Sequence, residues 1–147
     1  MSASAKFVPS RSQASFWSQI GVPPRGRKLY EAIEAGFDFS TYQKLATATG
    51  IERKELARIT NIKSATLSRR AKDGKFSSDE SDRLYRYAEV YNASLRLFEN
   101  NKIKAFQWMH NPVKALGYIA PSDMLKTSAE TEEVLSVIGR LEHGVFN

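Results

Sequence analysis

Hydroxyl and cationic side chains gather in one short stretch of the sequence, residues 63–72. Side chains of these types bond to phosphate oxygens and to base edges, and an arginine can engage a guanine through two parallel hydrogen bonds. The full candidate set is Lys63, Ser64, Thr66, Ser68, Arg69, Arg70 and Lys72. Those expected nearest the bases are Ser64, Thr66 and Arg69, and those expected mostly on phosphates are Lys63, Arg70 and Lys72. The chemistry predicted here is recognition of DNA.

Residues 53–72 have the layout of a helix-turn-helix that would present these side chains. Two short helices that cross steeply need a small residue where they touch, a tight turn between them and apolar packing positions. Ala57 is the small residue, and Asn61 can adopt the left-handed conformation of the turn. The apolar positions are Leu56, Ile62 and Leu67. Arg70 departs from the usual pattern, because its site near the end of the second helix is commonly apolar.

The positive charge of the chain lies in its first half. The 147 residues have a net charge of +6. Residues 1–75 hold 14 Lys and Arg against 6 Asp and Glu, a net charge of +8, whereas residues 76–147 hold 8 against 10, a net charge of −2. Affinity for DNA comes largely from counterions released from phosphates, so this asymmetry supports DNA binding. A solvated basic face on an ordinary helical hairpin is the alternative.

The remainder of the chain is predicted to be helical, which gives an all-α fold class. A helix is expected over residues 27–35, with Leu29, Tyr30 and Ile33 on one side and a left-handed Gly36 after it. The next is expected to begin at Ser40, with Gln43 completing a capping box, and to end at Gly50. Further helices are expected over residues 52–60 and 64–73. Before all of these, Phe16, Trp17 and Ile20 predict a short segment docked onto the body.

The second half is predicted to begin from one long helix. Residues 77–80 form a capping box, and apolar residues then recur at helical spacing as a core spine. This stripe consists of Leu84, Tyr87, Ala88, Tyr91, Leu95 and Phe98. A helix over residues 101–110 and a turn that closes at Gly117 follow. The last helix is expected to begin at Thr127 or Ser128 and to end at Gly144, with acidic residues first and Arg140 and His143 last.

Several classes of site and location are excluded or disfavoured. The chain has no cysteine, so disulfides, cysteine-based zinc sites and thiol nucleophiles are excluded. His110 and His143 are the only histidines and have no metal-ligand spacing, so we expect no metal site, no cofactor and no catalytic residue. No leader pattern or apolar run of about 20 residues is present, which predicts a soluble, cytoplasmic protein without membrane contact.

With its second half in view, the chain resembles the Xre/MbcA/ParS family of antitoxins. The matching pieces are GVPP with LYEAIEAGF, then TLSRR, SSDESDRLYRYAEV, AFQWMHNPVKALGYIAPSDML and VLSVIGRLEHGVF, which extend over nearly everything after residue 20. The resemblance implies an Xre-type helix-turn-helix followed by a small helical toxin-binding domain. It also implies dimerisation, repression of the protein's own operon and a cognate RES-domain toxin that consumes NAD. The sequence departs from this family at two places. Thr127-Ser128-Ala129-Glu130 stands where relatives usually carry a Thr-Glu-x-Gly pattern, and Tyr118 stands where they tend to have a second glycine.

The chain is expected to consist of three parts. Residues 1–20 are expected to be a flexible basic segment, residues 21–98 a DNA-binding and dimerisation domain, and residues 99–147 the toxin-binding domain. About 50 residues are few to bury a separate core, so the apolar stripes of the long helix and the second half are expected to hold a homodimer. An operator with two half-sites would follow from its two-fold axis.

The end of the chain is the candidate toxin-binding site. Val145 and Phe146 place apolar side chains at a terminus that is normally polar, so they need a partner. Either Phe146 folds back onto its own domain, or the tail blocks the toxin's substrate entrance, where its carboxylate would meet the cationic groups that bind NAD. The candidate residues are Arg140, Glu142, His143, Val145, Phe146 and Asn147.

Two other functions remain possible from the residues alone. A stand-alone helix-turn-helix regulator could use its second half to dimerise or to sense a ligand, with Trp108, Met109 and His110 around a pocket. Residues of these types at helical spacing are more often core, which is the interpretation preferred here. An enzyme is poorly supported, because the acidic residues at 130, 132 and 133 are better explained as the start of a helix.

Overall fold

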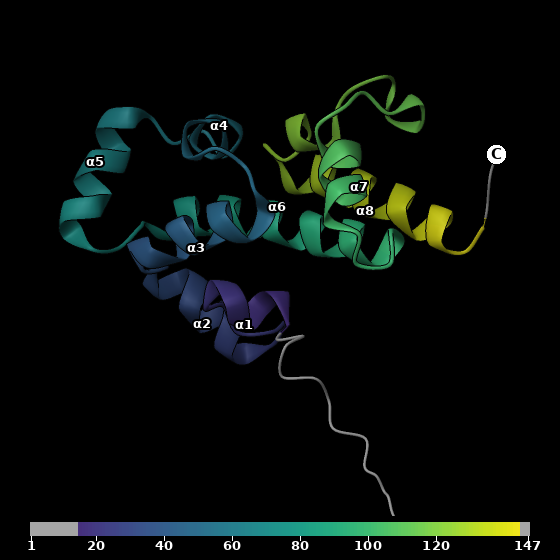
Figure 1. Ribbon diagram of the computed structural model, residues 1–147. Helices are drawn as coiled ribbons and strands as arrows, with labels where there is room; N and C mark the ends of the chain where they lie inside the picture. The colour runs from purple at the N-terminus through teal and green to yellow at the C-terminus, as the bar shows by residue number, and fades with distance from the viewer. Residues whose placement is uncertain (1–14, 145–147) are drawn as a thin grey trace, which may run out of the picture.

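The computed structural model describes residues 15–144, and these form an all-helical protein without strands, as predicted. Figure 1 shows the arrangement of the helices. In chain order they are α1 (Phe16–Ile20), α2 (Arg27–Ala35), α3 (Phe39–Thr49), α4 (Arg53–Ile59), α5 (Ser64–Asp73), α6 (Ser78–Leu97), α7 (Lys102–Met109), the 3-10 turns η2 (Lys114–Leu116) and η3 (Pro121–Asp123), and α8 (Ser128–Glu142). Within residues 15–144, no helix combines the length and apolar character needed to cross a membrane.

Side-chain caps begin the later helices where the sequence predicts them. Ser77 accepts a hydrogen bond from the Glu80 backbone, and the Glu80 carboxylate accepts one from the Ser77 backbone, which completes the capping box of α6. Thr127 caps α8 and Asn101 caps α7 through their side-chain oxygens. The cap predicted at Ser40 is wrong. Helix α3 begins one residue earlier, after Asp38, whose side chain makes no capping hydrogen bond.

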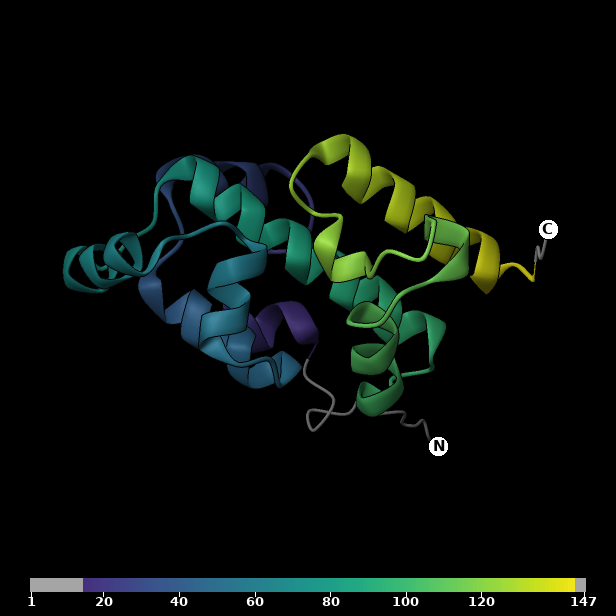
Figure 2. The ribbon, with the colours of Figure 1, turned by 90° about the horizontal axis from the view of Figure 1, so that it is seen from above.

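The long helix α6 is the common core of both halves of the chain. Figures 1 and 2 show it crossing the molecule, with α3, α4 and α5 around its beginning and α7 and α8 around its end. Its apolar stripe is buried as predicted, except for Phe98, which is only partly buried. Because the other helices of the same chain already bury this stripe, the expectation that the stripe forms a dimer interface is wrong, and the homodimer itself stays a prediction. The apolar surface that would be needed is already used within one molecule.

The short helix α1 is packed against the body, as predicted for Phe16, Trp17 and Ile20. Phe16 and Ile20 are buried, and the Phe16 ring lies 5.2 Å from that of Tyr91. Trp17 stacks on Tyr85 with 5.5 Å between the ring centroids. The prediction of a flexible segment over residues 1–20 is therefore wrong for residues 16–20, which form this packed helix. Its first 14 residues lie outside the described part of the chain.

The turn between α2 and α3 lies against the segment that follows α5. The Phe39 backbone donates to the carbonyl of Gly74 at 2.8 Å, and the Phe76 backbone donates to the carbonyl of Phe37 at 2.9 Å. Gly36 has φ 94° and ψ 129°, so it is not in the left-handed helical region predicted for it. A Cβ atom there would lie 2.1 Å from the Phe76 carbonyl oxygen. Tyr30, predicted to lie on the same side of α2 as Leu29, is exposed, whereas Leu29 is buried.

Candidate nucleic-acid interface and toxin-binding end

The helix-turn-helix has the predicted geometry. Ala57 is buried where α4 meets its neighbours, and the Ile62 backbone donates to the Ala57 carbonyl at 2.9 Å. Asn61 has φ 57°, so the turn uses the left-handed conformation that asparagine tolerates. Leu56 and Ile62 are buried, while Leu67 is only partly buried. These contacts place α5 directly after the turn, as the second helix of the motif.

Helix α5 carries the candidate DNA-binding residues, but not all of them face solvent. Lys63, which precedes the helix, is exposed. The exposed candidates within α5 are Ser64, Ser68, Arg69 and Lys72. Thr66 and Arg70 are half-buried, and their four-residue spacing places them on the same side of the helix as Leu67. Helical spacing in the sequence predicts that Thr66 faces outward and that Ser68 lies near the margin of this face. The two positions are reversed in the structure, because α5 is rotated so that residues 66, 67 and 70 face the body.

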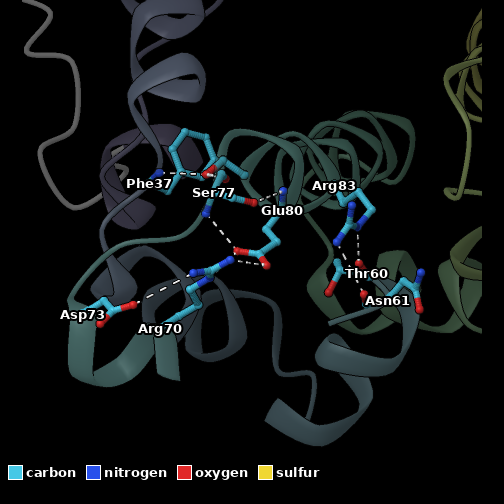
Figure 3. Close-up of polar contacts among 9 residues, drawn as sticks. Phe37, Thr60, Asn61, Arg70, Asp73, Ser77, Glu80 and Arg83 are labelled. Carbon is cyan, nitrogen blue, oxygen red and sulfur yellow. Dashed lines mark hydrogen bonds and ion pairs between the residues drawn. The ribbon is translucent and has the colours of Figure 1, made fainter. Parts of the chain in front are cut away.

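Arg70 forms an ion pair across to the beginning of α6. Its Nε and Nη2 atoms donate to the two carboxylate oxygens of Glu80 at 2.8 and 3.0 Å, as Figure 3 shows. Its Nη1 atom lies 3.9 Å from the Asp73 carboxylate. Burial alone would raise the pKa of Glu80, but the hydrogen bonds from Arg70 and from Ser77 outweigh burial and lower that pKa. Arg70 thus points to a protein carboxylate, whereas the sequence predicts that it contacts mostly phosphates.

A second arginine contact holds the turn before α5. The Arg83 Nε atom donates to the Thr60 carbonyl at 2.6 Å, and its Nη2 atom lies 3.4 Å from the Asn61 carbonyl. The Thr60 hydroxyl in turn donates to the Leu56 carbonyl at 2.6 Å. Figure 3 shows that Arg83 and Glu80 reach the motif from neighbouring turns of α6.

Sequence reasoning missed Glu80 and Arg83 as partners of the motif. Glu80 was identified only as part of a capping box, and Arg83 was not singled out. The one available signal was Arg70, a cation at a commonly apolar position, which requires an anion nearby if it is not solvated. Nothing local in the sequence identified Glu80 as that anion.

The two halves of the chain also meet through ion pairs and backbone contacts. Arg58 of α4 lies 3.2 Å from the Asp123 carboxylate of η3 and also pairs with Glu55. Arg86 of α6 donates to the backbone carbonyls of Leu125 and Lys126, at 3.3 and 2.9 Å. The helix-turn-helix therefore contacts η3 directly, and α6 holds the segment that precedes α8.

The residues around position 109 belong to the core, as preferred from the sequence. Met109 is fully buried, and Trp108 is half-buried against the core. His110 Nε2 lies 3.1 Å from the hydroxyl of Tyr87, whose side chain is also buried. Burial lowers the pKa of His110 below its usual value, because a desolvated imidazole is more stable when neutral. Within residues 15–144, no group of three or more acidic and histidine side chains is placed to hold a metal ion.

The described part of the candidate toxin-binding end is exposed. Arg140, Glu142 and His143 lie in and just after the last turn of α8, and all three face solvent. Arg140 donates to the Ser136 hydroxyl at 2.9 Å, and Glu142 lies 3.7 Å from the Nε atom of Arg96. The remaining candidates, Val145, Phe146 and Asn147, lie outside the described residues.

The end of α8 and helix α5 lie far apart on the molecule. In both Figure 1 and Figure 2, α5 stands at one extremity and the end of α8 at the other, with α6 between them. A partner bound at either extremity would therefore leave the other one accessible.

Comparison with known proteins agrees with this organisation. Residues 28–89 match the antitoxin Xre-like helix-turn-helix domain. Residues 95–144 match the antitoxin Xre/MbcA/ParS C-terminal toxin-binding domain. The junction between the two matches falls inside α6, the helix that both halves share.

Three relatives match this chain over nearly their whole length. The chain is 38% identical to an "Antitoxin Xre" of Yersinia enterocolitica over 95% of this chain and 96% of the relative. It is 34% identical to an "Antitoxin Xre" of Photorhabdus laumondii over 96% of this chain and 98% of the relative. It is also 24% identical to a "Prs ADP-ribosylating antitoxin" of Sphingobium over 86% of this chain and 91% of the relative. The resemblance found in the sequence is thereby confirmed, and the chain belongs to the Xre family of antitoxins, with a helix-turn-helix domain followed by a toxin-binding domain.

Proposed function

We propose that this antitoxin neutralises a cognate RES-type, NAD-consuming toxin by blocking its active site, and that it represses its own operon by binding operator DNA. The observation that carries the proposal is the separation of two exposed functional ends by α6. One chain can then hold a toxin at the end of α8 while α5 contacts DNA. The name of the Sphingobium relative supports a NAD-consuming partner, because transfer of ADP-ribose takes NAD as its donor.

On the DNA side, the exposed residues in and just before α5 form two groups, which contact different parts of the DNA. Ser64, Ser68 and Arg69 read base edges in the major groove, while the longer cations Lys63 and Lys72 contact phosphates. Thr66 is half-buried and lies at the margin of this surface. The Arg70 guanidinium already donates to both carboxylate oxygens of Glu80, so Arg70 is not among the residues that contact phosphates.

Mobility shifts with the protein's own promoter test this assignment. Arg69→Ala is expected to cost about 1–3 kcal/mol of operator affinity and to relax sequence specificity, since a base contact is lost. Lys72→Ala is expected to weaken binding to all sequences alike and to reduce the salt slope by about one. An unchanged operator affinity in the double variant R69A/K72A would show that α5 is not the DNA-facing surface.

The operator-binding species is a homodimer on a palindromic site. Its interface lies outside the α6 stripe, since that stripe is buried within one chain. Light scattering of the full chain, with and without operator, is expected to give twice the mass of one chain. A monomer under both conditions would reject this part of the proposal.

On the toxin side, neutralisation is steric and electrostatic, with no catalysis by the antitoxin. The blocking residues are Arg140, Glu142, His143, Val145, Phe146 and Asn147. The toxin's pocket must admit an anionic dinucleotide, so it offers cationic groups that the carboxylate-ended tail occupies.

Deletion of residues 142–147 separates the toxin side from the DNA side. The shortened chain is expected to keep its helical circular dichroism and its operator affinity but to lose rescue of cells that express the toxin. The NAD-consuming activity of the purified toxin should also escape inhibition by the shortened chain. Arg69→Ala serves as the matched control, since it should rescue cells while losing operator affinity. Full rescue by the shortened chain would overturn the blocking role of the tail.

A further inference from the structure

Helix α5 has little apolar contact to fix its direction. None of its residues 64–73, all within the described part of the chain, is buried. Leu67 is the one large apolar side chain of α5, and it is only partly buried against the core. Figure 1 shows the helix projecting from one end of the molecule. Burial of apolar surface, which orients most helices, therefore contributes little to the orientation of α5. Directional polar contacts must fix that orientation instead.

Two polar contacts from α6 bracket α5. Arg83 donates to the Thr60 and Asn61 carbonyls in the turn before it. The Glu80 carboxylate accepts two hydrogen bonds from Arg70, which lies in the last two turns of α5. Glu80 and Arg83 are three residues apart, so they project from one face of α6. Figure 3 shows both contacts on this face.

The Glu80 carboxylate is itself fixed in place. Glu80 is 7% exposed, and its Oε1 atom also accepts a hydrogen bond from the Ser77 backbone at 2.8 Å. If Arg70 turned outward to a phosphate, this carboxylate would lose its cation while remaining buried, which is strongly unfavourable. A two-point contact between planar groups also fixes angle as well as distance, which a single lysine contact would not.

We propose that Glu80 and Arg83 of α6 set the angle at which α5 meets DNA, and that Arg70 is a positioning residue that acts through Glu80. This inference rests on the proposed operator binding. The inference explains why an arginine stands at position 70, where an apolar residue is usual: Arg70 orients the helix. Arg70 is then not one of the residues that contact phosphate.

Four variants distinguish positioning from phosphate contact. Arg70→Ala and Glu80→Gln each break the pair, and Arg70→Lys keeps the positive charge while losing the two-point geometry. Lys72→Ala is the matched control, an exposed cation on the same helix. Each full-length variant is checked by circular dichroism, its operator affinity is measured over a range of salt, and amide hydrogen exchange of residues 64–73 is followed without DNA.

Positioning predicts that all three pair variants lower operator affinity by about tenfold without changing the salt slope. The double variant R70A/E80Q should lose no more than either single variant, since the two residues act as one unit. Exchange of residues 64–73 should accelerate in every pair variant and stay unchanged in Lys72→Ala. Lys72→Ala should instead reduce the salt slope by about one.

The opposite results would overturn the inference. Phosphate contact predicts that Arg70→Ala reduces the salt slope by about one, that Arg70→Lys binds like the natural protein and that Glu80→Gln has no effect. If the natural protein shows no operator binding, the proposed function fails, and the exchange measurement still decides the inference about α5. Unchanged exchange in both Arg70→Ala and Glu80→Gln would show that the pair does not hold the helix.

Discussion

Tyr118 occupies a backbone conformation that most side chains avoid. It has φ 64° in the turn closed by the bridge between Val113 and Ile119, and its side chain is 67% exposed. A left-handed conformation costs a residue with a Cβ atom roughly 1–2 kcal/mol, and glycine gives back part of this through its larger unfolded-state entropy. Tyr118→Gly is therefore expected to raise the free energy of unfolding by about 0.5–1 kcal/mol.

Tyr118→Ala is the control for that prediction, because it removes the exposed ring and keeps the strain. Denaturant unfolding should show a gain for glycine and none for alanine. Equal stabilities for the two variants would mean that the backbone at residue 118 is not strained. A glycine variant that is more stable but rescues cells less well from the toxin would show that strain is retained there for binding.

His110 makes stability depend on pH. Burial lowers its pKa in the folded protein, so the unfolded chain takes up a proton more readily than the folded one. The resulting stability is complete above the unfolded pKa of about 6.5 and is lost as the pH falls toward the lower folded value. His110→Gln is expected to flatten the loss of unfolding free energy between about pH 7 and pH 5.5, as measured by urea denaturation.

A pH profile that His110→Gln leaves unchanged would contradict the assignment of this pH dependence to burial of His110 beside Tyr87.

At the scale of elements, Gly36 joins α2 and α3 to the segment after α5. A Cβ atom there would meet the Phe76 carbonyl oxygen at 2.1 Å, and the backbone has φ 94°. Gly36→Ala is expected to lower the free energy of unfolding by about 3 kcal/mol, through both overlap and backbone strain. Gly50→Ala is the control, because φ is 82° and nothing lies within 4 Å, so it should lose only about 1 kcal/mol. Equal losses in thermal and denaturant unfolding would contradict the role of the Phe76 contact.

Most helix boundaries could be predicted because their signals are local. Ser77 and Glu80, Thr127, and Gly74 act within one turn of the ends that they mark. The rotation of α5 could not be predicted in this way. It depends on Arg70 meeting a carboxylate on another helix, so Thr66 turns inward and Ser68 outward. Apolar spacing within α5 was too weak to reveal this, since Leu67 is its one large apolar side chain.

At the scale of the whole molecule, α6 makes the two halves one folding unit. Its residues Tyr87, Val90 and Tyr91 are fully buried, as are Val134 and Val137 of the α8 helix beside it. A chain ending at residue 98 would expose that side of α6 to water and is expected to lose cooperative thermal unfolding. The full chain should melt in a single transition by circular dichroism. A sharp melt of residues 1–98 alone would show that the first half folds independently.

The same sharing explains what the sequence could not decide about assembly. An apolar stripe indicates that a helix needs a partner but not whether that partner lies in the same chain. We expected the stripe of α6 to meet a second copy, and it is buried by other helices of its own chain. The toxin-binding tail is a different case, since its apolar residues at 145 and 146 lie outside the described part of the chain and stay a prediction.

The absence of buried side chains in residues 64–73 has a consequence for how these antitoxins diversify. Under the proposed operator binding, a substitution at an exposed position such as Ser64, Ser68 or Arg69 is expected to alter operator preference at little cost to folding, since surface changes usually shift stability by less than about 0.5 kcal/mol. Duplicated operons in one genome could therefore drift to separate operators while both proteins stay folded. By the same reasoning, randomising these positions while leaving Arg70, Glu80 and Arg83 intact is expected to retarget the proposed repressor to other operators.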